Sequence, residues 1–145
     1  MERILDWNKY LDTAAKMVSE GIVMLKNENN ALPLDTDKEV AVFGRIQFHY
    51  YKSGTGSGGM VNVTKVVNIL DGLIDNGVKV NEKLLDIYRK WDKENPFDLG
   101  EGWGGEPWSQ KEMPLDEGLV KETAKSCETA IVIIGRTAGE EQDNR

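Results

Sequence analysis

The feature that most constrains the fold is a continuous apolar run at 129–135. It reads Thr-Ala-Ile-Val-Ile-Ile-Gly, and an unbroken apolar run of this length that ends in glycine is typical of a strand buried on both faces. A second run of the same kind, Glu-Val-Ala-Val-Phe-Gly, lies at 39–44. Both runs are therefore predicted to be fully buried strands.

Helical patterns alternate with these strands. The expected helices span 7–20, 64–76, 81–95 and 116–126, and two further short strands are expected at 22–25 and 78–80. Gly21 is expected to follow the first helix as its C′ residue, while Thr64 and Asn81 are expected N-caps. The alternation predicts an α/β fold, with a mostly parallel sheet and helices on both faces.

Composition bounds the partners and the chemistry. The chain has 145 residues and a net charge of −7, which fits one domain and argues against nucleic-acid binding, because that rests on basic side chains. This acidic balance is compatible with a neutral ligand such as a sugar. One cysteine and one histidine make no metal site. Cys127, just before the final strand, is interpreted as a buried thiol rather than a nucleophile.

The chain also lacks the usual marks of export or membrane insertion. Charged residues follow Met1 closely, with no apolar core of a signal peptide. The longest apolar runs are far shorter than a membrane span. We therefore expect a cytoplasmic protein that does not interact with a membrane.

A cluster of acidic residues follows the final apolar run. Glu140, Glu141 and Asp143 fall within four positions, between Arg136 and Arg145. In α/β sheets ligands bind outside the carboxyl ends of the strands, so these acids are placed where chemistry is expected. The alternative is a solvated acidic loop that is paired with the two arginines.

A glycine-rich loop at 54–59 formally matches the dinucleotide fingerprint. That fingerprint must lie directly between a strand and a helix, whereas Phe43 and Thr64 both lie too far from these glycines. Nucleotide binding is therefore not predicted, and the glycines are expected to let the loop fold tightly. His49 precedes them, as either a packed or solvated loop residue or a substrate contact.

Residues 97–115 form a long irregular stretch that is rich in glycine, proline and tryptophan. A loop of this length in a compact domain is usually functional or an insertion. Trp103 and Trp108 are candidate substrate-binding residues that could stack on a sugar face, although they could instead attach the loop to the domain. Trp7 and Trp91 are interpreted as partly buried helix residues.

Three stretches of this chain together resemble one known family. The first comprises 14–27, the Leu-Pro-Leu at 32–34 and the apolar run at 40–44; the second is Gly-Thr-Gly-Ser-Gly at 54–58; the third is 130–145. In this order they are similar to the α/β-sandwich, or C-terminal, domain of family 3 glycoside hydrolases, the β-glucosidases. The resemblance spans nearly the whole chain.

The resemblance implies a division of labour between two domains. In that family a (β/α)8 barrel supplies an aspartate nucleophile and the sandwich domain supplies the acid/base glutamate. Residues 1–145 would then be a partial sandwich domain without its catalytic barrel. Because the sandwich motif begins close to Met1, the resemblance implies either a member with inverted domain order, truncated after Arg145, or the sandwich domain on its own.

The resemblance also implies which residue acts. The acid/base glutamate of the family follows a glycine in the motif V-G-x-x-x-G-E-G-x-D-R, and it therefore maps onto Glu140. This chain has Glu141 where the family often has glycine, and it has an extra Asn144 before Arg145. Glu141 therefore stays open as the alternative acid/base residue.

The expected function is a part of a retaining, exo-acting β-glycosidase that hydrolyses terminal β-linked sugars and uses no metal or organic cofactor. This part alone is expected to be inactive. The rival hypothesis is a non-catalytic ligand-binding or interaction module of doubly wound α/β fold. An incomplete sheet would expose an apolar edge, which makes a homo-oligomer possible.

Overall fold

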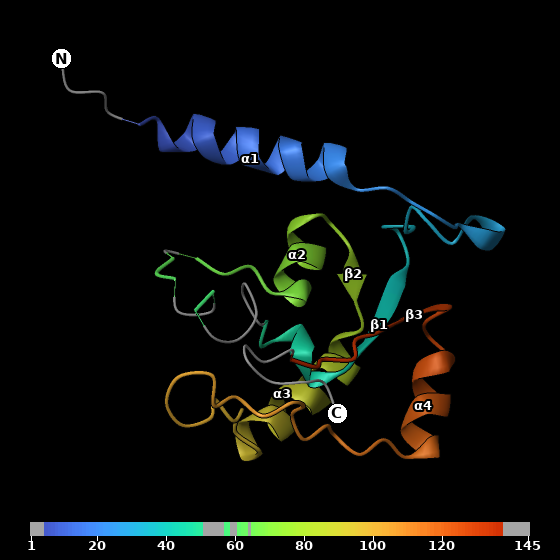
Figure 1. Ribbon diagram of the computed structural model, residues 1–145. Coiled ribbons are helices and arrows are strands. Elements are labelled where there is room, and N and C mark those ends of the chain that lie inside the picture. Colours follow the sequence, from blue (N-terminus) through green and yellow to red (C-terminus); the bar gives the residue numbers. More distant parts are fainter. Residues whose placement is uncertain (1–4, 51–56, 59–60, 64, 138–145) are drawn as a thin grey trace. The chain divides into compact units, whose positions relative to one another are not determined.

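The computed structural model describes residues 5–50, 57–58, 61–63 and 65–137, and the chain divides into two compact units (Figure 1). The first unit is Met1–Leu34 and the second is Asp35–Arg145. The second unit contains the whole sheet. None of the helices in the described ranges is both long and apolar enough to cross a membrane.

The first unit contains helix α1, Trp7–Gly21. The side chain of Asp6 caps it by accepting a hydrogen bond from the backbone N–H of Lys9 at 3.1 Å. The helix predicted over 7–20 is thus confirmed, except that Gly21 is its last residue and the extended Ile22 ends it. The strand predicted at 22–25 is wrong, because these residues pair with none of the strands in the described ranges.

The second unit is built on a three-stranded parallel sheet. Its strands are β1 at Glu39–Phe43, β2 at Lys79–Val80 and β3 at Thr129–Val132, in the order β2-β1-β3. Val40 is in register with Val80 on one side and with Thr129 on the other. The mostly parallel sheet predicted from the sequence is confirmed.

Three helices connect these strands, and each begins at a polar cap. They are α2 at Ile69–Asp75, α3 at Glu82–Glu94 and α4 at Glu117–Ala124. Asn81 caps α3 as expected, because its Oδ1 accepts a hydrogen bond from the backbone N–H of Leu84. Asp116 caps α4 in the same way, through an Oδ1 that accepts from the N–H of Leu119. Thr64 lies outside the described residues, and α2 begins later than predicted because Asn68 caps it.

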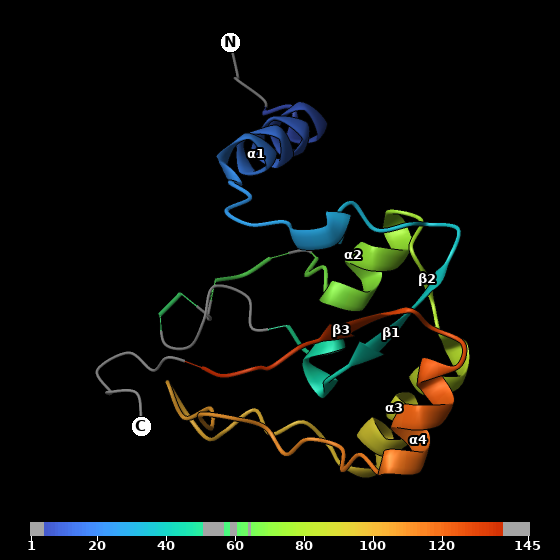
Figure 2. The ribbon, with the colours of Figure 1, turned by 90° about the vertical axis from the view of Figure 1, so that its right-hand side faces the viewer.

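The helices lie on both faces of the sheet, as predicted (Figures 1 and 2). Side chains along a strand alternate between the two faces, and β1 therefore contributes to two separate cores. Ala41 and Phe43 pack with Tyr88 of α3. Val40 and Val42 pack with Leu70 of α2 on the other face. Cys127 is buried in the first of these cores, as the sequence predicts.

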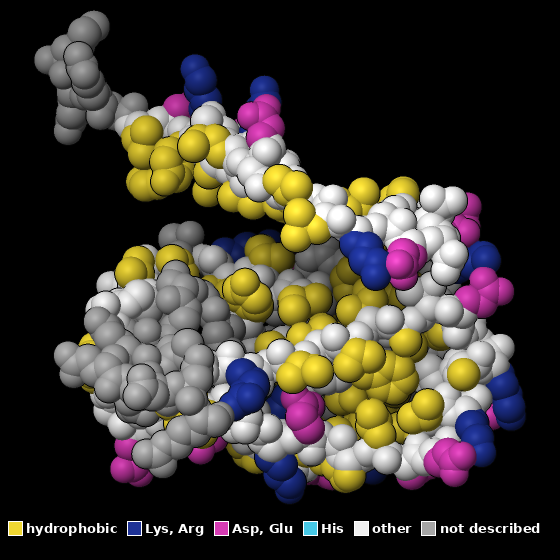
Figure 3. Space-filling model, turned by 45° about the vertical axis from the view of Figure 1, so that its right-hand side comes forward, with side chains coloured by type: hydrophobic (Ala, Val, Ile, Leu, Met, Phe, Trp, Pro, Cys, Tyr) yellow, Lys and Arg dark blue, Asp and Glu magenta, His cyan; other side chains and the backbone are white. Residues whose placement is uncertain are grey.

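Strand β3 corrects the prediction that the run at 129–135 is fully buried. Val132 is 67% exposed and Ile134, just after the strand, is 83% exposed. The physical reason is position: β3 lies at the edge of the sheet and pairs only with β1 among the described strands. Ile131 and Ile133 are partly buried against the second core. Hydrophobic side chains consequently reach the surface of the protein (Figure 3).

Candidate functional site

The carboxyl ends of β1 and β3 meet at one edge of the sheet, and two glycines make their close approach possible. Gly44 has a φ of 106°, and a Cβ atom there would collide with the carbonyl oxygen of Ile133. A Cβ atom on Gly135 would collide with the side chain of Ile46. With this space free, the N–H of Ile133 donates to the carbonyl of Phe43 at 2.8 Å.

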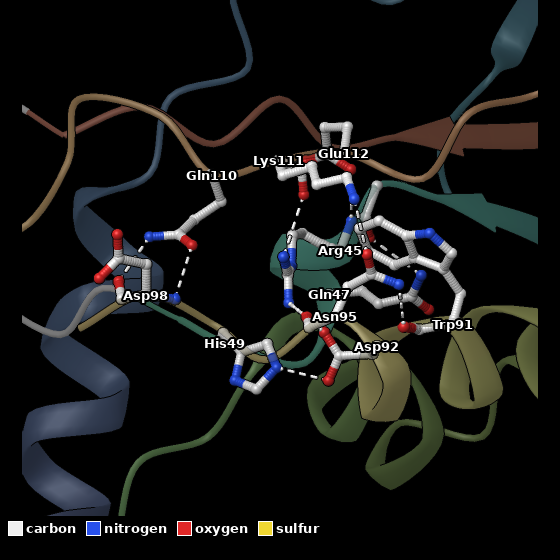
Figure 4. A network of polar contacts seen from close by, with 11 residues as sticks. Arg45, Gln47, His49, Trp91, Asp92, Asn95, Asp98, Gln110, Lys111 and Glu112 are labelled. Carbon is white, nitrogen blue, oxygen red and sulfur yellow. Dashed lines mark hydrogen bonds and ion pairs between the residues drawn. The ribbon is translucent and has the colours of Figure 1, made fainter. Parts of the chain in front are cut away.

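Arg45 lies two residues after the end of β1, and its side chain is only 1% exposed (Figure 4). Nη2 donates to Asp92 Oδ1 and to the carbonyl oxygen of Asn95, both at 2.7 Å. Nη1 donates to the carbonyl oxygen of Lys111 at 3.0 Å, while the backbone N–H of Arg45 donates to Glu112 Oε2 at 3.0 Å. A buried charge needs such an ion pair and hydrogen bonds to offset its lost hydration.

Aromatic rings surround the same guanidinium group. Its Cζ lies 4.9 Å from the ring centroid of Trp91 and 5.4 Å from that of Phe97, within the range of cation–π attraction. The ring of His49 packs on Phe97 with centroids 4.6 Å apart, and its Nε2 lies 2.7 Å from Asp92 Oδ2. His49 is therefore a packed loop residue that shares the carboxylate of Asp92 with Arg45.

Tyr88, on α3, lies against the end of β1. Its hydroxyl oxygen accepts a hydrogen bond from the N–H of Gly44 at 3.0 Å. Burial raises the pKa of Tyr88 above its ordinary value; the N–H of Gly44 opposes this rise and the charge of Glu112 adds to it. The hydroxyl group thus stays neutral and fixes the backbone where β1 ends.

The chain leaving β3 is attached to a distant segment of the loop. The N–H of Thr137 donates to the carbonyl of Trp108 at 2.9 Å, and its Oγ1 donates to the carbonyl of Pro107 at 3.1 Å. That segment is itself fixed, because Gln110 exchanges two hydrogen bonds with the backbone of Asp98, at 2.7 and 2.9 Å. Thr137 lies three residues before Glu140 in the sequence.

A hollow of about 480 Å³ opens at this edge of the sheet. Val132 and Met113 contribute apolar walls, while Ser109, Glu112 and Arg136 contribute polar groups. Its volume lies in the range of small-molecule sites, which also combine apolar walls with a few polar groups. The hollow is thus where ligand binding is expected for a parallel sheet.

The structure describes only some of the residues singled out from the sequence. Glu140 and Glu141 lie outside the described residues, as do the glycines at 54, 56 and 59. Trp103 is exposed, and Trp108 is half-buried, with its backbone carbonyl bound to Thr137. In the described ranges, no group of three or more His, Cys, Asp or Glu side chains could hold a metal ion.

The other two tryptophans differ from each other. Trp91 is partly buried, as predicted, whereas Trp7 is exposed on α1. The sequence analysis also missed Arg45 and Thr137. A signal existed for Arg45, because glycine followed by arginine ends both apolar runs. Thr137 has no such signal, since its partners lie about 30 residues earlier in an irregular loop.

Comparison with known proteins gives a consistent result. Residues 22–145 match the glycosyl hydrolase family 3 C-terminal domain. The chain is 64% identical to a β-glucosidase of Ruminococcus albus over 140 residues and 32% identical to β-glucosidase A of Butyrivibrio fibrisolvens over 146 residues. These matches cover 97% and 99% of this chain, but only 15% and 17% of the two relatives.

Solved structures agree. A β-glucosidase of Paenibacillus barengoltzii matches with a TM-score of 0.84 and 54% identity, over 92% of this chain and 15% of that one. β-Glucosidase 3B of Thermotoga neapolitana, in complex with glucose, matches with a TM-score of 0.79 and 29% identity, over 97% of this chain and 19% of that one. The chain thus corresponds to a small part of each of these longer proteins.

Proposed function

This chain belongs to glycosyl hydrolase family 3, whose C-terminal domain it matches, and from this premise we propose that it is the part of a retaining, exo-acting β-glycosidase that contributes the acid/base carboxylate, Glu140. The observation that supports the proposal is the course of the chain. It leaves β3 at the shared edge of the sheet, and Thr137 is fixed there three residues before Glu140.

The proposed mechanism needs two carboxyl groups. A retaining glycosidase places them roughly 5–5.5 Å apart, on either side of the scissile bond. In our proposal an aspartate of a (β/α)8 barrel domain attacks the anomeric carbon, while Glu140 protonates the leaving oxygen. Glu140 then takes the proton from the water that hydrolyses the glycosyl-enzyme.

We propose terminal β-linked glucose as the sugar, because the relatives are named β-glucosidases. The hollow at the edge of the sheet supports this proposal, since it offers apolar walls beside polar groups. Trp103 is exposed and available to stack on a sugar face, as sequence analysis suggests. No cofactor is needed, because both steps are proton transfers coupled to attack by an oxygen nucleophile.

The decisive test is Glu140→Ala in the full-length enzyme, with Glu141→Ala as the matched control. Substrates with poor leaving groups should slow by about 10²–10⁴-fold, whereas activated aryl glucosides need little protonation and should retain their first step. Added azide should restore turnover of the activated substrate, because this anion attacks the glycosyl-enzyme without a base. Rescue of Glu141→Ala instead would move the assignment by one residue.

If neither variant responds to azide, the acid/base lies elsewhere and the rival, a non-catalytic binding module, becomes the better account. The 145-residue chain alone provides a second test. We propose that it does not hydrolyse aryl β-glucosides above the buffer rate, because the nucleophile belongs to another domain. Turnover that a mechanism-based glucosidase inactivator abolishes would contradict this.

We also propose that the chain self-associates. Val132 and Ile134 expose apolar surface along the edge of the sheet, and uncovered strand edges and apolar patches favour association. Sedimentation of the purified chain over a range of concentrations should show a dimer or a larger species. A monomer at the highest concentration would contradict the proposal.

A further inference from the structure

We propose that Thr137 is a positioning residue for the acid/base carboxylate, acting through its two hydrogen bonds to the backbone of residues 107 and 108. The inference rests on the proposed function of Glu140 and adds to it the group that directs the chain toward the reaction. Thr137 itself contacts neither substrate nor nucleophile in this proposal.

The first argument is the short chain distance between the two residues. Glu140 follows Thr137 by three residues, so their Cα atoms are at most about 11 Å apart even in a fully extended chain. Thr137 therefore fixes a point of the chain within this distance of Glu140. Acid/base catalysis is sensitive to such displacements, because a shift of about 1 Å can lower the rate about 100-fold.

The second argument is that Thr137 is fixed at both of its polar groups. Its side chain is buried, with the residue only 6% exposed. Its N–H is bound to the carbonyl of Trp108 at 2.9 Å, and its Oγ1 is bound to the carbonyl of Pro107 at 3.1 Å. Two bonds to neighbouring carbonyls define the orientation of the residue, which one bond alone would leave free to rotate.

The third argument is that these acceptors belong to a segment attached to the sheet. Residues 107–112 are joined to β1 through Arg45, whose Nη1 donates to the carbonyl of Lys111 and whose N–H donates to Glu112. On the other side of Thr137, Gly135 packs directly against Ile46. The direction in which the chain leaves the sheet is thus set by contacts with two separate segments.

The experiment compares three variants of the full-length enzyme. Thr137→Val removes the hydroxyl donor and keeps the shape of the side chain, while Thr137→Ser keeps the donor. Thr123→Val is the matched control: Thr123 is 7% exposed, and its Oγ1 also donates to a backbone carbonyl, that of Leu119 at 2.9 Å within α4. Each variant is assayed with an alkyl glucoside and with an activated aryl glucoside, and its melting temperature is measured.

A positioning role predicts a selective loss. For Thr137→Val we expect kcat for the alkyl glucoside to fall about tenfold, and kcat for the activated aryl glucoside to change less than about twofold in its glycosylation step. Thr137→Ser should be close to the unsubstituted enzyme. Thr123→Val should lower the melting temperature to a similar degree but leave the ratio of the two rates unchanged.

Two results would overturn the inference. One is an equal loss on both substrates, or no loss, for Thr137→Val; the other is the same selective loss for Thr123→Val. Glu140→Ala separates this failure from a failure of the proposed function. If azide rescues Glu140→Ala while Thr137→Val is not selective, only the positioning role is wrong; if azide does not rescue Glu140→Ala, both are wrong.

Discussion

Strands β1 and β3 are similar in sequence, and both runs end in glycine followed by arginine. Their surroundings differ completely. β1 lies between two strands, and its apolar side chains pack into a core on each face. β3 lies at the edge, with Val132 in contact with solvent. The comparison shows that an apolar run predicts a strand, whereas its neighbours in the sheet decide whether that strand is buried.

The two arginines extend the comparison beyond the strands. Arg45 is buried, because the end of α3 supplies Asp92 and the carbonyl of Asn95, and Trp91 covers the guanidinium group. Arg136 also follows the glycine that ends its apolar run, but it lies four residues after β3 and is exposed. The burial of a residue at this edge thus depends on groups that lie 47 and 50 residues away in the chain, which local sequence does not reveal.

The largest expected effect comes from replacing these arginines in the 145-residue chain. Arg45→Met should lower the free energy of unfolding by about 3–5 kcal/mol, because it leaves the buried acceptors without their charged partner. Arg136→Met should lower it by less than about 1 kcal/mol, as for other exposed charges. Urea unfolding followed by circular dichroism measures both, and equal costs would contradict the comparison.

Replacing the two glycines at this edge should have the next largest effects on the free energy of unfolding. Gly44→Ala should cost about 3 kcal/mol, because its positive φ and the carbonyl of Ile133 both oppose a side chain. Gly135→Ala should cost less, since its obstacle is the side chain of Ile46. Adding Ile46→Ala should therefore reduce the cost of Gly135→Ala by about 1 kcal/mol in a double-mutant cycle and leave that of Gly44→Ala unchanged. Equal coupling at both glycines would be the contrary result.

A matched pair of valines tests burial directly. Val42→Ala should lower the free energy of unfolding by about 2 kcal/mol, because two buried methyl groups are lost and a cavity remains. Val132→Ala should cost less than about 0.5 kcal/mol, because Val132 is exposed. Urea unfolding again provides the measurement. A cost of about 2 kcal/mol for Val132→Ala would mean that β3 is covered in solution, as in the proposed oligomer.

The smallest expected effect is a pH dependence of stability, which arises from Tyr88 at the end of β1. Because burial raises the pKa of Tyr88, its contribution to stability is complete below the ordinary value of about 10 and is lost as pH rises through the raised value. The free energy of unfolding should therefore fall more in the unsubstituted chain than in Tyr88→Phe as the pH rises above about 10. Parallel curves for the two proteins would show that Tyr88 titrates normally.

Local signals predicted much of this fold. Asn81 is a cap that acts through its own side chain, as the sequence predicts. Residues 39–43 form the expected strand because their apolar pattern matches their position in the sheet. By contrast, 22–25 carry the same kind of pattern without a partner among the described strands. The sequence predicts Thr64 as a cap, whereas Asn68 lies next to the helix and caps it.

The candidate site, too, has features that the sequence predicts and features that it does not. The edge of the sheet could be predicted, because strand ends are readable from the glycines that follow them. The contacts that organise this edge could not, since Arg45 and Thr137 bind backbone carbonyls of the irregular segment around 107–112. Any residue type provides such an acceptor, and no spacing in the sequence marks it.

The register of the sheet also has a consequence for the order of folding during synthesis. Val40 pairs with Val80 on one side and with Thr129 on the other. A ribosome releases β1 and β2 before β3, so one edge of β1 stays unpaired until residues 129–132 have been synthesised, and such edges are prone to wrong pairing. The sheet closes only when the residues just before Thr137 arrive. The described strands are therefore fully paired only close to the residue proposed to act in catalysis, and a nascent chain halted before β3 should need a chaperone more than one that includes it.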